Sequence, residues 1–94
     1  MADDSRRDHS IRQAIGRTQE VFESLVARRG ELYATKVTTF VACDKLFLRH
    51  QPTQQDHVAF CHALMHSMHI DTPQQMHDFV TDAMIVRRAQ EYTL

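Results

Sequence analysis

Residues 31–50, ELYATKVTTFVACDKLFLRH, form the most apolar stretch of this 94-residue chain. Apolar side chains recur there at the three- and four-residue spacing of one helix face. The main stripe consists of Tyr33, Val37, Phe40, Val41, Phe47 and Leu48. Leu32, Cys43 and Leu46 widen it to more than half of the circumference. A helix that is apolar over so much of its surface is usually central to a core or covered by a partner.

Asp44 interrupts this pattern, because it falls within the main apolar stripe. A buried carboxylate must be paired or neutralised. We expect Asp44 to pair with an Arg or His of a neighbouring helix, or to reach solvent through an incomplete core. The alternative is a contact that sets the register across an oligomer interface, which makes Asp44 a candidate interface residue.

The chain before this stretch predicts an amphipathic helix that begins at Asp4 or Ser5 and ends near Arg29, with residues 1–4 frayed. Gly30 follows the basic pair at its end, which is a common stop signal. One residue is too short for a helical hairpin, which needs about 2–5 residues. We therefore favour a kink or break at Gly30, and one helix continuous through Gly30 is the alternative.

Two further helices are predicted after Pro52, which ends the apolar stretch. Thr53 with Asp56 resembles a capping box and starts a helix that runs to about His69. Its expected core face is Val58, Cys61, Leu64, Met65 and Met68. After a short turn, Thr72 with Gln75 forms a good capping box for the last helix. Its apolar stripe is Met76, Phe79, Val80, Ala83, Met84 and Val86.

These elements predict an all-α fold: a small four-helix, bundle-like single domain over residues 1–94 with a C-terminal helical hairpin. The hydrophobic fraction of 43% suits a folded globular chain, and two Gly and two Pro leave little room for turns. We expect the core to centre on Phe22, Leu25, Val37, Phe40, Val41, Phe47, Leu64, Met68, Phe79 and Val80.

Composition narrows the class of protein. The formal net charge is -1, so the chain has no global field that attracts nucleic acid or an anionic membrane. The polar start lacks the apolar region of a signal peptide, and no apolar run approaches about 18 residues. Two cysteines in such a chain favour reduced thiols, so we expect a cytoplasmic protein. Nine Arg against two Lys favour a high-GC genome, bacterial or phage.

Seven histidines are many for this length, and His62, His66 and His69 share one stripe of the third helix. Imidazoles one turn apart can chelate Zn²⁺, so these three are weak candidate ligands. We favour a polar surface stripe over a native metal site. A cluster of Cys43, Cys61 and His57 is conceivable, but the spacing of a structural zinc site is missing. We therefore favour buried thiols and expect no metal or cofactor.

No catalytic motif stands out, since the chain lacks a GxSxG turn, a P-loop and a Rossmann pattern. We expect a protein-interaction module rather than an enzyme: an adaptor, small chaperone, inhibitor or immunity-type protein that self-associates. Ile85 and Tyr92 lie one heptad apart on a second face of the last helix. The candidate protein-interface residues are Leu46, Asp44, Ile85, Arg88 and Tyr92.

Two other classes remain open. The short turn before the last helix suits a helix-turn-helix DNA-binding regulator, in which Gln74, Gln75, His77 and Thr81 would meet base edges. Asp78 and Asp82 would then face the phosphates, which disfavours this class. The other alternative is a His-rich metal- or pH-responsive protein, because seven imidazoles titrate near a pKa of about 6.5.

Overall fold

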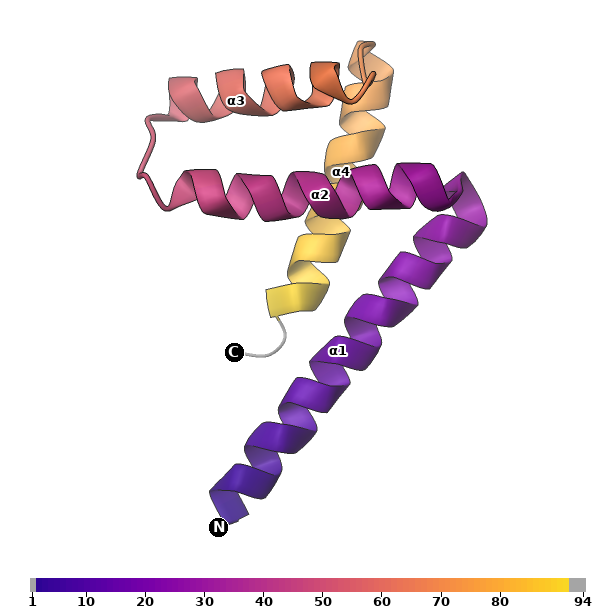
Figure 1. Cartoon of the computed structure of the whole chain (residues 1–94), viewed down its shortest axis with the longest axis vertical. Helices are drawn as coiled ribbons and strands as arrows, with labels where there is room; N and C mark the ends of the chain where they lie inside the picture. The colour runs from indigo at the N-terminus through magenta and orange to yellow at the C-terminus, as the bar shows by residue number, and fades with distance from the viewer. Residues whose placement is uncertain (1, 92–94) are drawn as a thin grey trace.

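The computed structural model describes the backbone of residues 2–91 and the side chains of residues 16–91 (Figure 1). Over this range the chain is all-α, as the sequence predicted. The elements are α1 (Ala2–Arg29), α2 (Glu31–Leu48), α3 (Gln54–Ser67) and α4 (Pro73–Gln90). α1 is helical from Ala2, ahead of the start expected from the capping residues.

The helices form two layers. In Figure 1, α2 and α3 run side by side in opposite directions, and α4 crosses behind α2. α1 leaves the joint at the start of α2 and packs on both α2 and α4. The Cα atoms span 50 × 34 × 15 Å, and the radius of gyration is 15.2 Å, against about 12 Å for a compact domain of this length. The molecule is therefore flat and elongated.

Gly30 alone joins α1 to α2, so the predicted break is confirmed. Its backbone angles of φ 92° and ψ 160° lie in a region that essentially only glycine adopts. Its N–H donates to the carbonyl of Val26 at 2.8 Å, and its carbonyl accepts from the N–H of Ala34 at 3.1 Å. Both helices use the backbone of Gly30, so the chain turns sharply without leaving these polar groups unpaired.

Side-chain caps fix the ends of the last two helices. Thr53 accepts a hydrogen bond from the N–H of Asp56, and Thr72 with Gln75 forms the predicted capping box. α3 ends at Ser67 rather than near His69. His69 takes a left-handed conformation with φ 64°, and the N–H of Ile70 donates to the carbonyl of Met65 at 2.9 Å. This C-terminal cap forms without glycine and buries Ile70.

The core lies between α1, α2 and α4, with α3 covering one side of α2. Phe79 is fully buried, and its ring meets Tyr33 and Phe40 edge-on at centroid distances of 5.8 and 5.2 Å. Of the predicted core, Leu25, Val37, Phe40, Val41 and Phe79 are buried, and Phe22, Leu64, Met68 and Val80 pack beside them. Two expectations need correction. Val58 is exposed, and Phe47 is half-buried, stacked on Phe60 at 4.0 Å.

Candidate functional site

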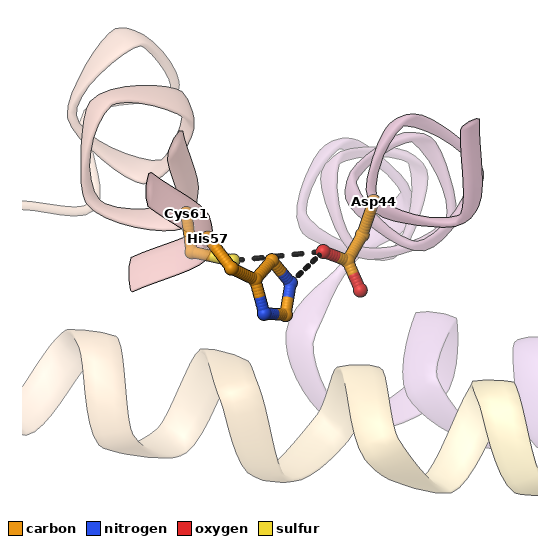
Figure 2. A group of neighbouring side chains, drawn as sticks. All are labelled: Asp44, His57 and Cys61. Carbon is orange, nitrogen blue, oxygen red and sulfur yellow. Dashed lines mark hydrogen bonds and ion pairs between the residues drawn. The ribbon is translucent and has the colours of Figure 1, made fainter. Parts of the chain in front are cut away.

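The buried carboxylate of Asp44 is the centre of a polar cluster between α2, α3 and α4 (Figure 2). His57 donates from Nε2 to Asp44 Oδ1 at 2.5 Å, and Arg87 donates from Nη1 to Asp44 Oδ2 at 3.4 Å. The pairing with an Arg and a His of neighbouring helices matches the first expectation for Asp44. These contacts tie α2 to the other two helices at one point.

Cys61 completes this cluster from one turn further along α3. Its thiol donates to Asp44 Oδ1 at 3.6 Å, so one carboxylate oxygen receives both the imidazole and the thiol. Burial, and then the negative charge of Asp44, raise the pKa of Cys61 to about 11. The thiol is therefore protonated near neutral pH. A nucleophilic cysteine needs the opposite, a pKa lowered by a neighbouring base or cation.

The cluster borders a pocket of about 300 Å³ whose other walls are mainly apolar. Phe40 and Val41 line it from α2, and Val80, Ala83 and Met84 line it from α4. Asp44, His57, Cys61 and Arg87 supply its polar wall. A mainly apolar pocket with a few convergent polar groups is the usual form of a small ligand site.

The same three side chains offer ligand atoms to a cation. An oxygen of Asp44, a ring nitrogen of His57 and the sulfur of Cys61 all lie within 4.8 Å of one another. Within the described residues, no other three His, Cys, Asp or Glu side chains group in this way. The stripe of His62, His66 and His69 does not assemble, because α3 ends before His69 and His66 instead contacts Asp71 at 2.6 Å.

A second buried carboxylate, Asp82, lies on α4. Tyr33 donates its hydroxyl to Asp82 at 2.7 Å, and Arg28 approaches the other carboxylate oxygen at 3.7 Å. Burial, followed by the hydrogen bond to Asp82, raises the pKa of Tyr33 to about 12. The guanidinium of Arg29 stacks on the Tyr33 ring at 4.4 Å. This network joins α1, α2 and α4 beside the Gly30 joint.

The outer face of α2 carries an exposed stripe without charge. It consists of Leu32, Thr35, Thr39, Ala42 and Leu46, all exposed and spaced three and four residues apart. We call these five residues the outer stripe of α2. Leu32 and Leu46, at its two ends, are 71% and 56% exposed. The stripe lies on the side of α2 opposite Asp44, since the side chains of a helix advance about 100° per residue.

The other predicted interface residues lie on different surfaces. Ile85 is exposed on α4 and, with Arg88, lines a shallow pocket against Arg17 and Val21 of α1. Tyr92 lies outside the described residues. Asp44 faces the interior and binds groups of its own chain, whereas Leu46 faces outward. The five candidates therefore do not form one surface among the described residues.

The residues suggested for DNA contact are partly engaged within the chain. The Gln75 side chain accepts from the N–H groups of Asp71 and Thr72 at 3.1 Å, which completes the capping box. Gln74 donates to Asp78, and Thr81 donates to the carbonyl of His77. These polar groups form hydrogen bonds within α4 and its N-terminal cap, which does not favour their use in reading DNA bases.

Comparison with protein-family models, with curated proteins and with solved structures finds no match to this chain. Among the described residues, no helix is both long and apolar enough to cross a membrane.

Sequence reasoning did not place three members of these clusters. Arg87 was not singled out. Asp82 was considered only as a residue that would face the phosphates in the DNA-binding alternative, and His57 only in a cluster with Cys43 and Cys61. The sequence does contain a signal for the burial of Asp82, because this residue lies between Phe79 and Val86 on the buried arc of α4. Asp44 interrupts the buried arc of α2 in the same way. For His57 and Arg87 no signal exists, since their contacts with Asp44 depend on how the helices cross.

Proposed function

We propose that this chain is a protein-interaction module that pairs with a second copy of itself through the outer stripe of α2. The main support for this proposal is the outer stripe itself, which has five exposed, uncharged residues along about four turns of a helix whose opposite face is buried. The outer faces of surface helices in ordinary monomers usually carry several charged side chains, whereas this stripe carries none. Thr and Ala in its middle allow another helix to approach closely, and Leu32 and Leu46 supply apolar contact at its ends.

The charges beside the stripe favour a second copy as the partner. Glu31 and Arg49 flank it on the same edge, at opposite ends roughly 27 Å apart along the helix axis. In an antiparallel two-fold pair, residues on the same edge meet across the interface. Each Glu31 would then lie beside Arg49 of the other copy. Neither side chain makes an ion pair within the described part of its own chain.

The first test is the absolute mass of the full chain in solution, measured by light scattering on a sizing column from micromolar to millimolar protein. We expect a dimer. Leu46→Glu places a charge in the stripe and should yield a monomer with an unchanged helical circular dichroism spectrum. Ile85→Glu makes the same change at an exposed residue of α4 and should leave the dimer intact.

A charge swap tests the antiparallel arrangement. Glu31→Arg and Arg49→Glu should each weaken the dimer, and the double variant should restore it, because the two charges exchange places. A wild-type chain that stays monomeric at every concentration contradicts the proposal. A dimer that Leu46→Glu leaves intact and Ile85→Glu dissociates would place the interface on α4 instead.

A further inference from the structure

The cluster of Asp44, His57 and Cys61 has the composition of a transition-metal site. It combines a carboxylate oxygen, an imidazole nitrogen and a sulfur, the three ligand types that Zn²⁺ takes in proteins. His57 and Cys61 lie one turn apart on α3, and Asp44 comes from α2. The ligands thus approach from two helices, which avoids the poor geometry of three ligands on one straight helix.

The distances suit a small ion after a slight opening. With metal–ligand bonds of 2.0–2.3 Å, the ligand atoms of a tetrahedral site lie about 3.3–3.8 Å apart. Asp44 Oδ1 and Cys61 Sγ are already 3.6 Å apart. Asp44 Oδ1 and His57 Nε2, at 2.5 Å, must separate by roughly 0.8 Å to reach the lower end of that range. An ion between them replaces a hydrogen bond with two stronger contacts.

The surroundings supply the supporting contact and the access that metal sites need. Arg87 donates to Asp44 Oδ2, the oxygen that neither His57 nor Cys61 contacts, and so fixes the orientation of the carboxylate. All three ligand residues line the pocket between α2, α3 and α4, which gives an ion its entry path. The pocket also leaves room for water or an anionic group at a fourth position.

We propose that Asp44, His57 and Cys61 bind one Zn²⁺ ion, with the fourth ligand position open to the pocket. On binding, zinc forms bonds with Asp44 Oδ1, with His57 Nε2 and with the sulfur of Cys61. The thiol proton passes to solvent, and the proton on His57 Nε2 is replaced by one on Nδ1 through exchange with solvent, so the imidazole stays neutral. The bound ion fastens α3 to α2. With one thiolate, one carboxylate and the Arg87 guanidinium beside the ion, the site carries one net positive charge. An anionic fourth ligand neutralises it.

The test uses the reduced full-length chain without a histidine tag, titrated with Co²⁺ and then with Zn²⁺. We expect one Co²⁺ per chain, with the absorption band of a thiolate–cobalt bond, and displacement of Co²⁺ by Zn²⁺. Zinc at about 100 times its Kd should raise the melting temperature by roughly 10 °C or more. Cys61→Ser should remove the thiolate band, and Asp44→Asn should remove the stabilisation by zinc.

Matched controls separate this site from adventitious binding. His62→Gln and His66→Gln remove exposed histidines of α3, and Cys43→Ser removes the other thiol, so all three should bind as the wild type does. Absence of the thiolate band from the wild-type spectrum contradicts the proposal, whether or not the variants fold. Stabilisation that persists in Cys61→Ser and disappears in His62→Gln or His66→Gln would assign binding to the helix surface. The site lies across α2 from the outer stripe, so its test does not depend on the proposed dimer.

Discussion

Asp44 and Leu46 are two residues apart on α2 and lie on opposite sides of the helix. Asp44 is 7% exposed and accepts hydrogen bonds from His57, Cys61 and Arg87, whereas Leu46 is 56% exposed. The inner side of α2 therefore holds a polar cluster, and its outer side is uncharged. A substitution on one side of α2 should therefore leave the contacts of the other side unchanged.

Asp44→Ala should lower the free energy of unfolding by about 1–3 kcal/mol, because it leaves three half-buried donors without their acceptor. Arg87 is 40% exposed and can turn to water, which limits the loss. Urea unfolding of the metal-free chain measures the change. Glu20→Ala, at an exposed acidic residue of α1, should stay within about 0.5 kcal/mol of wild type. Equal stabilities for the two variants would mean that the cluster contributes nothing.

Phe79→Ala should cost about 3–5 kcal/mol, since it removes the ring that contacts Tyr33 and Phe40 and leaves a cavity. In a domain of this size such a loss lowers the melting temperature by more than 10 °C or unfolds the chain. Phe79→Leu fills part of the space, so its stability should fall between those of the wild type and Phe79→Ala. Thermal unfolding followed by circular dichroism makes the comparison. A loss below about 1 kcal/mol for Phe79→Ala would contradict the described core.

Two glycine substitutions should have opposite effects. Gly30→Ala forces a side chain into backbone angles that disfavour it and should cost about 1–3 kcal/mol, although no atom lies within 4 Å of the added carbon. Gly16→Ala lies inside α1, also with open space around it, and should stabilise by up to about 1 kcal/mol. Chemical denaturation of both variants tests this. Stabilisation by both would mean that α1 continues straight through residue 30.

Tyr33 should make the stability fall at high pH. The unfolded tyrosine ionises near its ordinary pKa of 10.0 and the folded one near about 12, so the folded state holds this proton more tightly. The contribution is complete below about pH 10 and is lost as the pH rises towards 12. Tyr33→Phe should reduce this loss, measured by urea unfolding at about pH 8 and about pH 11. Cys61 adds a similar loss from its own raised pKa, so the difference between wild type and variant is the quantity to compare.

Local chemistry made most of the fold predictable. Gly30, Pro52, and the pair of Thr72 with Gln75 act on their own backbone, so helix boundaries follow from residue type and spacing. The end of α3 was missed because His69 adopts the left-handed conformation that usually belongs to glycine. Val58 was placed in the core because periodicity gives an arc of a helix but not how much of that arc a neighbour covers.

The candidate site was predictable only in part. Asp44 stands out as a carboxylate in an apolar stripe, and that pattern also suggests an Arg or His partner. Which Arg and which His pair with Asp44 depends on how α2 crosses α3 and α4. The two partners, His57 and Arg87, lie 13 and 43 positions from Asp44 in the sequence. The outer stripe of α2 was visible as extra apolar width at Leu32 and Leu46. That the stripe is exposed could not be predicted, because it depends on α3 and α4 packing on other sides of α2.

The flatness of the molecule bears on how so small a domain holds two internal carboxylates. Because its Cα atoms span only 15 Å along the shortest axis, few layers of side chains cover Asp44 and Asp82, which remain 7% and 8% exposed. Each carboxylate therefore stays close to water, which polarises in response to its charge. The desolvation cost of each ion is correspondingly smaller. A thin slab of helices can therefore keep ionisable groups inside that a rounder domain of the same length would exclude.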